Sequence, residues 1–169
     1  MRVFSLAAAS ALGASVLCAS LTAPAGAATT GDTHGGGAVT GRAHLDGAQE
    51  VPGPGDPDGR GWFRFKADGD KLCYSLRVRR VETPTAAHIH FGPKGEAGPI
   101  AVALKTPPED GKVRGCIRAQ EHQNPANANR VLTFWELQGI KKDTFVFYVN
   151  VHNAEFPAGA VRGQLKRTH

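Results

Sequence analysis

The sequence predicts an all-β domain, an antiparallel β-sandwich of Greek-key type, with one short helix near residues 131–137. Two observations support this prediction. From Val39 onward, short runs of alternating apolar and polar residues are separated by Gly, Pro and Asp clusters, as in sandwiches of antiparallel strands. Two of these runs, 62–67 and 72–79, flank Asp68-Gly69, and an Asp-Gly pair between alternating runs indicates a hairpin.

The other elements are assigned by periodicity. In the run 86–91, His88 and His90 share one face and apolar residues the other, because side chains alternate along a strand. The run 144–152 is the strongest strand, and its apolar residues on both faces predict burial on both sides. Residues 131–137 have apolar residues at near-helical spacing, which predicts the short helix, with a strand as the alternative. Further strands are predicted at 99–104, 113–119 and 161–166.

The N-terminus has the three parts of a secretory signal peptide. Arg2 gives a positive start, residues 3–21 carry no charge, and Ala25-Gly26-Ala27 forms a small-x-small cleavage site. We therefore expect a secreted, extracellular protein whose mature chain begins at Ala28 or Thr29, with no transmembrane anchor after cleavage. An uncleaved membrane anchor is the alternative.

Length and charge limit the domain organisation. Removing 27 residues from 169 leaves 142, which is enough for one domain with a core. We divide the chain into a signal peptide (1–27), a flexible mature N-terminus (28–38) and the β-sandwich domain (39–167). The net charge of +5 falls to +4 without Arg2, and the basic residues are dispersed along the sequence. This pattern predicts a solvated basic surface and no nucleic-acid partner.

Cys73 and Cys116 are the only cysteines beyond the predicted leader. Two cysteines in an exported chain predict one disulfide bond, with two free thiols as soft metal ligands as the alternative. Strand alternation places both on polar faces. The bond is therefore expected to join the outer faces of neighbouring strands, or a sheet edge, and not to cross the core.

Three motifs carry a family resemblance. Residues 87–100 read A-H-I-H-F-G-P-x-G-x-x-G-P-I, residues 148–165 read Y-V-N-V-H-N-x-x-F-P-x-G-x-x-R-G-Q-L, and residues 45–52 read L-D-G-x-x-E-V-P. Over residues 39–165 the chain resembles the CHRD domain, the repeat unit first named in chordin. The resemblance implies a sandwich of superoxide-dismutase-like or immunoglobulin-like type. Together with the leader, it identifies the chain as a bacterial secreted member, for which the family implies no particular activity.

Histidines supply the candidate metal ligands. His88 and His90 leave the same strand face, and His152 ends a second strand, so the three imidazoles would converge on Cu or Zn if those strands are neighbours. An H-x-H strand with a later His also resembles the copper ligands of copper-zinc superoxide dismutases, although the bridging His and Asp cluster for zinc is missing. Hydrogen bonding that fixes loops is the alternative role. Three further histidines, His34, His44 and His122, are expected in solvent, and any of them could serve as a fourth ligand.

No catalytic residue is predicted, because the sequence lacks G-x-S-x-G, S-x-x-K and a plausible Cys-His pair. The Gly-rich loop 92–98 has neither phosphate-loop spacing nor a following helix. Arg162 is expected to pair with Glu50 or Glu136, or to stay exposed. We therefore expect no enzyme, but a CHRD-like binding module, extracellular or cell-wall-associated, whose partner is an extracellular protein or wall polymer. The alternative function is a small extracytoplasmic copper- or zinc-binding protein.

Overall fold

The computed structural model describes residues 37–168, which form nine strands, one α-helix and three short 3-10 helices. The predicted signal peptide, most of the predicted flexible N-terminus and His34 lie outside the described residues. Within residues 37–168, no helix is both long enough and apolar enough to cross a membrane. The elements are β1 (Val39–Asp46), η1 (Gly47–Gln49), β2 (Arg60–Asp68), β3 (Lys71–Arg79), β4 (Ala86–Phe91), β5 (Ile100–Ala103), β6 (Lys112–Arg118), η2 (Ala128–Arg130), α1 (Phe134–Lys142), η3 (Thr144–Val146), β7 (Phe147–His152), β8 (Val161–Gln164) and β9 (Lys166–Thr168).

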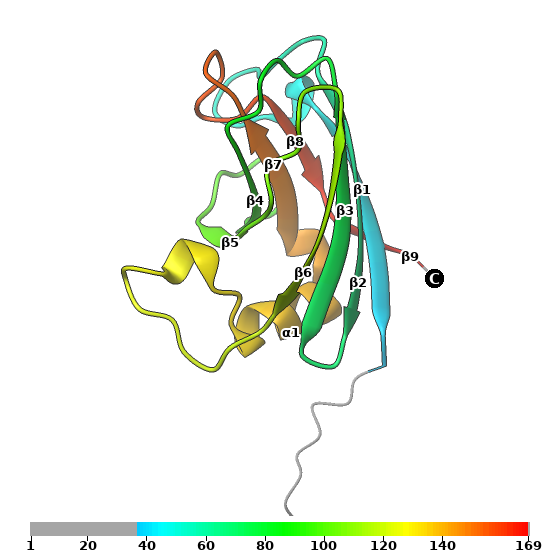
Figure 1. The fold of residues 1–169 in the computed structure, drawn as a ribbon, viewed down its shortest axis with the longest axis vertical. Helices are drawn as coiled ribbons and strands as arrows, with labels where there is room; N and C mark the ends of the chain where they lie inside the picture. The colour runs from blue at the N-terminus through cyan, green and yellow to red at the C-terminus, as the bar shows by residue number, and fades with distance from the viewer. Residues whose placement is uncertain (1–36, 169) are drawn as a thin grey trace, which may run out of the picture. The chain divides into compact units, whose positions relative to one another are not determined.

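The strands form one antiparallel sheet in the order β5-β4-β7-β8-β1-β2-β3-β6, with β9 paired to β1 beside this path. The sheet curls so that the half containing β4 and β7 faces the half containing β2 and β3 (Figure 1). Apolar side chains from both halves meet in one core, which includes Phe63 and Leu76 on one side and Ile89 and Val149 on the other. This arrangement confirms the predicted all-β fold.

The β2–β3 hairpin follows the sequence pattern. Asp68 pairs with Lys71 across the Gly69-Asp70 turn, and Gly69 has a φ of +53°, in the region that glycine adopts without steric penalty. The alternating burial of β3 places Cys73 away from the core. Cys73 lies directly opposite Cys116 on the edge strand β6, and the two form a disulfide. The bond thus joins the outer faces of neighbouring strands, as predicted.

Two predicted elements are displaced in the structure. The helix expected near 131–137 begins at Phe134 and continues to Lys142, because Thr133 caps its N-terminus: the Thr133 hydroxyl accepts from the backbone of Glu136, and the Glu136 carboxylate accepts from the backbone of Thr133. The strand expected from residue 144 begins only at Phe147, after a 3-10 turn. Phe147 is also the residue opposite Phe91, the last residue of β4, so β7 begins where its pairing with β4 begins.

Candidate metal centre

Strand β4 directs two imidazoles to the outer face of the sheet. Ala87 and Ile89 are almost fully buried in the core, so the alternating residues His88 and His90 point the opposite way. Strand β7 pairs with β4, and its register sets Ala86 opposite His152 and His88 opposite Asn150. His152 therefore leaves the same face as His88 and His90, which confirms that the two predicted strands are neighbours.

The three histidines come close enough to share an ion. His88 Nδ1 lies 3.1 Å from His152 Nε2, and one ligand nitrogen from each of the three rings can be chosen so that all lie within 4.8 Å of one another. Nitrogens around one ion at about 2.0 to 2.1 Å are separated by roughly 3 to 4 Å. In residues 37–168 this is the one group of three or more His, Cys, Asp or Glu residues with such spacing.

Backbone carbonyls fix the tautomers of two rings. His90 Nδ1 lies 3.0 Å from the carbonyl oxygen of Gly98, and His152 Nδ1 lies 3.0 Å from that of Pro157. A carbonyl only accepts, so both Nδ1 atoms carry the proton and both Nε2 atoms present a lone pair. This is the arrangement by which outer partners orient metal-binding imidazoles. The Nε2 atom of His90 is buried and has no hydrogen-bond partner.

Burial keeps the cluster neutral. Desolvation, followed by the proximity of His152 and His90, lowers the pKa of His88 to about 4. Desolvation also lowers the pKa values of His90 and His152, although their hydrogen bonds to backbone carbonyls act in the opposite direction. Neutral imidazole is the form that binds metal. The three imidazoles are therefore neutral at neutral pH. Because His152 Nδ1 carries its proton, His88 Nδ1 is the donor and His152 Nε2 the acceptor in the hydrogen bond between these two rings.

A layer of polar side chains supports the histidines. The ring of Tyr148 stacks on His90 at 4.8 Å between centroids, and the guanidinium carbon of Arg162 lies 3.5 Å from the centre of the Tyr148 ring. Arg162 is only 2% exposed and donates to the carbonyl oxygen of Pro93. The prediction that it could stay exposed or pair with Glu136 is wrong, because Glu136 caps the helix. Tyr148 was not predicted as a site residue, and its place in the motif at residues 148–165 was its only signal in the sequence.

Glu50 belongs to the same layer. Its Oε2 accepts a hydrogen bond from Asn150 Nδ2 at 3.0 Å, and its side chain interacts electrostatically with Arg162. Desolvation outweighs both of these stabilising interactions and raises the pKa of Glu50 to about 7. Glu50 thus contacts Asn150, which is the residue opposite His88 in the sheet. The pKa of the Glu50 carboxyl is near neutral pH.

The remaining described histidines are elsewhere. His44 points outward from β1 and lies 3.6 Å from Asp46, and His122 is exposed in the loop after β6, 3.8 Å from Glu121. Neither joins the cluster, so neither is the fourth ligand considered from the sequence.

Fold and site together define a β-sheet domain with a three-histidine cluster on the outer face of one half of the sheet. The chain belongs to the CHRD domain family: the sequence profile of the CHRD domain matches residues 41–165. No curated protein and no solved structure shows a significant match to the chain. The family points to an extracellular binding module in general terms.

Proposed function

We propose that this domain is a secreted binding module that holds one copper or zinc ion at His88, His90 and His152. The observation that carries the proposal is the fixed tautomer of His90 and His152, which leaves the Nε2 atom of each ring with a lone pair; that of His152 accepts from His88 Nδ1, and that of His90 is buried without a partner. A purely structural role would need the ring nitrogens to have partners, whereas the buried Nε2 of His90 has none.

The chemistry of the ligand set favours copper. Three imidazoles suit both Cu(II) and Zn(II), and Cu(II) binds more tightly to nitrogen sites of this kind. The fourth position would be left to solvent or to a ligand from a partner. An extracellular protein or wall polymer as that partner remains part of the proposal, and it is supported by the family match.

Isothermal titration of the metal-free protein with CuCl₂ and ZnCl₂ tests the site. We expect one ion per chain, with Cu(II) displacing Zn(II), and loss of binding in His88→Ala, His90→Ala and His152→Ala. His44→Ala and His122→Ala are matched controls, because both residues lie outside the cluster. If the cluster and control variants bind equally, the proposal is wrong and the three histidines are structural.

The pH dependence gives a second readout. An ordinary exposed histidine site loses metal as the pH falls below about 6.5, where imidazole becomes protonated. Because burial lowers the pKa values of all three histidines, that of His88 to about 4, we expect the cluster to keep its metal at a lower pH than an exposed histidine site does. Loss centred near pH 6.5 would show that the metal binds to exposed histidines instead.

A further inference from the structure

The outer face of the other half of the sheet gathers cations that are far apart in the sequence. Strand alternation turns one residue in two outward on β1, β2, β3 and β6, and β9 adds Lys166 next to β1. The basic residues that seemed dispersed along the chain thereby collect on one surface, which we call the basic face. It consists of Arg42, Arg64, Arg77, Lys112, Arg114 and Lys166.

The register of the sheet places like charges directly opposite each other. Arg42 is opposite both Arg64 and Lys166, and Arg77 is opposite Lys112. Directly opposite like charges destabilise a sheet. In the described part of the chain none of the six basic-face residues forms an ion pair. Because no acidic side chain of the described residues pairs with these six cations, the surface is suited to binding an anionic partner.

The acidic residues near this face lie at its two ends. Asp68 pairs with Lys66 at 2.9 Å and Asp70 pairs with Arg118 at the β2–β3 turn, whereas Asp46, at the end of β1, lies 3.6 Å from His44. One row of outward side chains crosses five neighbouring strands and consists of Lys166, Arg42, Arg64, Ser75 and Arg114. Four steps of about 4.8 Å make this row roughly 19 Å long.

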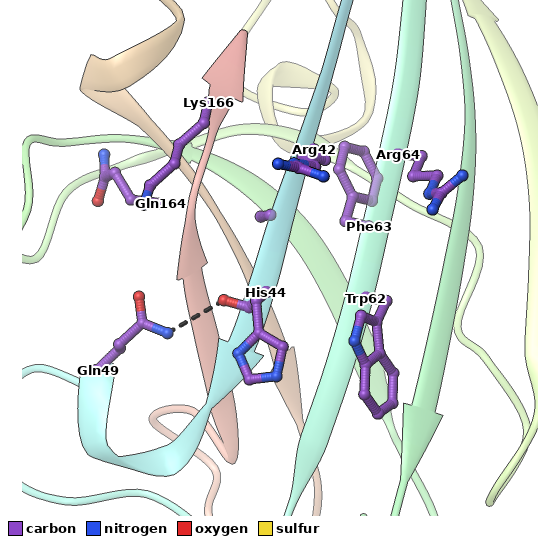
Figure 2. A pocket seen from close by; sticks show the side chains of 9 residues that line it. Arg42, His44, Gln49, Trp62, Phe63, Arg64, Gln164 and Lys166 are labelled. Carbon is purple, nitrogen blue, oxygen red and sulfur yellow. Dashed lines mark hydrogen bonds between the residues drawn. The ribbon is translucent and has the colours of Figure 1, made fainter. Parts of the chain in front are cut away.

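An aromatic side chain stands at the centre of the basic face. Trp62 is 43% exposed, and its ring makes a T-shaped contact with that of His44 at 5.6 Å between centroids. Figure 2 shows His44 and Trp62 side by side on β1 and β2, with Arg42 and Arg64 further along the same strands. Two grooves, of about 480 and 420 Å³, meet at Trp62 and Arg64, which line both.

We propose that the basic face binds an anionic polysaccharide, a sugar polymer that carries carboxylate or sulfate groups. Guanidinium groups match such anions with paired hydrogen bonds, and an exposed indole offers an apolar plate for the faces of sugar rings. The extended row of charges that runs beside Trp62 fits a linear chain better than a compact ligand.

Other polyanions fit less well. Insertion into an anionic membrane needs several apolar side chains on the same face, whereas the other exposed large apolar residues of the described chain, Phe91, Trp135 and Phe145, lie on β4, α1 and η3. Single-stranded nucleic acid is bound on several stacking aromatic residues, and the basic face has only Trp62 and His44.

Binding of the full mature chain to immobilised heparin and polygalacturonate tests the proposal, with neutral dextran, a 20-nucleotide oligothymidine and phosphatidylglycerol vesicles as comparison probes. The variant R42Q/R64Q/R77Q removes three charges from the basic face. The matched control K94Q/K105Q/K142Q removes three exposed charges elsewhere. Circular dichroism monitors folding, and the melting temperature of R42Q/R64Q/R77Q should not fall, because the substitutions relieve like-charge repulsion.

We expect both anionic polysaccharides to bind in a salt-sensitive manner, with affinity weakened roughly tenfold or more by R42Q/R64Q/R77Q and little changed by the control. Trp62→Ala should weaken polysaccharide binding without changing its salt dependence, since it removes no charge. Equal loss in the control, no effect of Trp62→Ala, or tighter binding of the oligonucleotide or vesicles would each overturn the assignment.

Discussion

Glu50→Gln probes the polar layer behind the histidines. Glu50 is 8% exposed and has a pKa of about 7 in the fold, against 4.5 for the free side chain. Below pH 4.5 the carboxyl is protonated in both folded and unfolded chains. Between 4.5 and 7 the folded chain retains a proton that the unfolded chain has lost, so the free energy of unfolding falls as the pH rises. Above pH 7 the full penalty of the buried charge is present.

The penalty can be estimated from the two pKa values. One pH unit corresponds to about 1.4 kcal/mol, which sets an upper limit of about 3 kcal/mol, and solvent screening reduces this to roughly 1 to 3 kcal/mol. Glutamine keeps an acceptor for Asn150 Nδ2 and resembles the protonated acid.

Urea unfolding of the metal-free wild type and Glu50→Gln at pH 4.5 and 8.5 measures the effect. We expect similar stabilities at pH 4.5 and a variant that is more stable by roughly 1 to 3 kcal/mol at pH 8.5. A stability difference that is the same at both pH values would refute the reasoning, because it would show that Glu50 does not titrate between them in the fold.

Three further predictions concern stability and can be measured by urea unfolding. The bond between Cys73 and Cys116 spans 43 positions, so Cys73→Ala/Cys116→Ala should lower the free energy of unfolding by about 2 to 4 kcal/mol, and an unchanged midpoint would contradict this. Thr133→Ala removes the helix cap and should cost about 1 kcal/mol, whereas Thr133→Ser should restore most of it. The lowered pKa of His88 contributes stability that is present above pH 6.5 and is lost as the pH falls toward about 4; His88→Gln should therefore flatten this acid limb in metal-free protein, and a limb of unchanged slope would oppose the idea.

Local patterns predicted the strands well. The alternation of β3 and the Asp68-Gly69 pair are local signals, and they correctly placed the hairpin and turned Cys73 outward. The helix was misplaced because apolar spacing alone set its limits. The pair Thr133 and Glu136, spaced as a capping box, would have located its start.

The site was only partly accessible from the sequence. Alternation along the strand places His88 and His90 on one face. The sequence brings His152 beside them only if β4 and β7 are neighbours, and in the structure these two strands are paired. The tautomers could not be predicted, because they depend on carbonyls of Gly98 and Pro157 that distant loops bring to the rings. The basic face was missed for a similar reason: only the register between strands gathers its charges.

The family motifs contribute to this site as well as to the core. Glu50 comes from the first motif, His90 and Gly98 from the second, and Asn150 and Gly159 from the third, yet all lie in or against one polar layer. A Cβ atom on Gly159 would lie 2.4 Å from Glu50 Oε2 and 2.6 Å from Asn150 Nδ2, and the backbone of Phe91 leaves no room for one on Gly98. Glycine at these positions lets the loops close over the layer and bring their carbonyls to the histidines. The motifs also contain core residues such as Ile89 and Val149, but their glycines and polar residues are explained by the packing and hydrogen bonds of this layer.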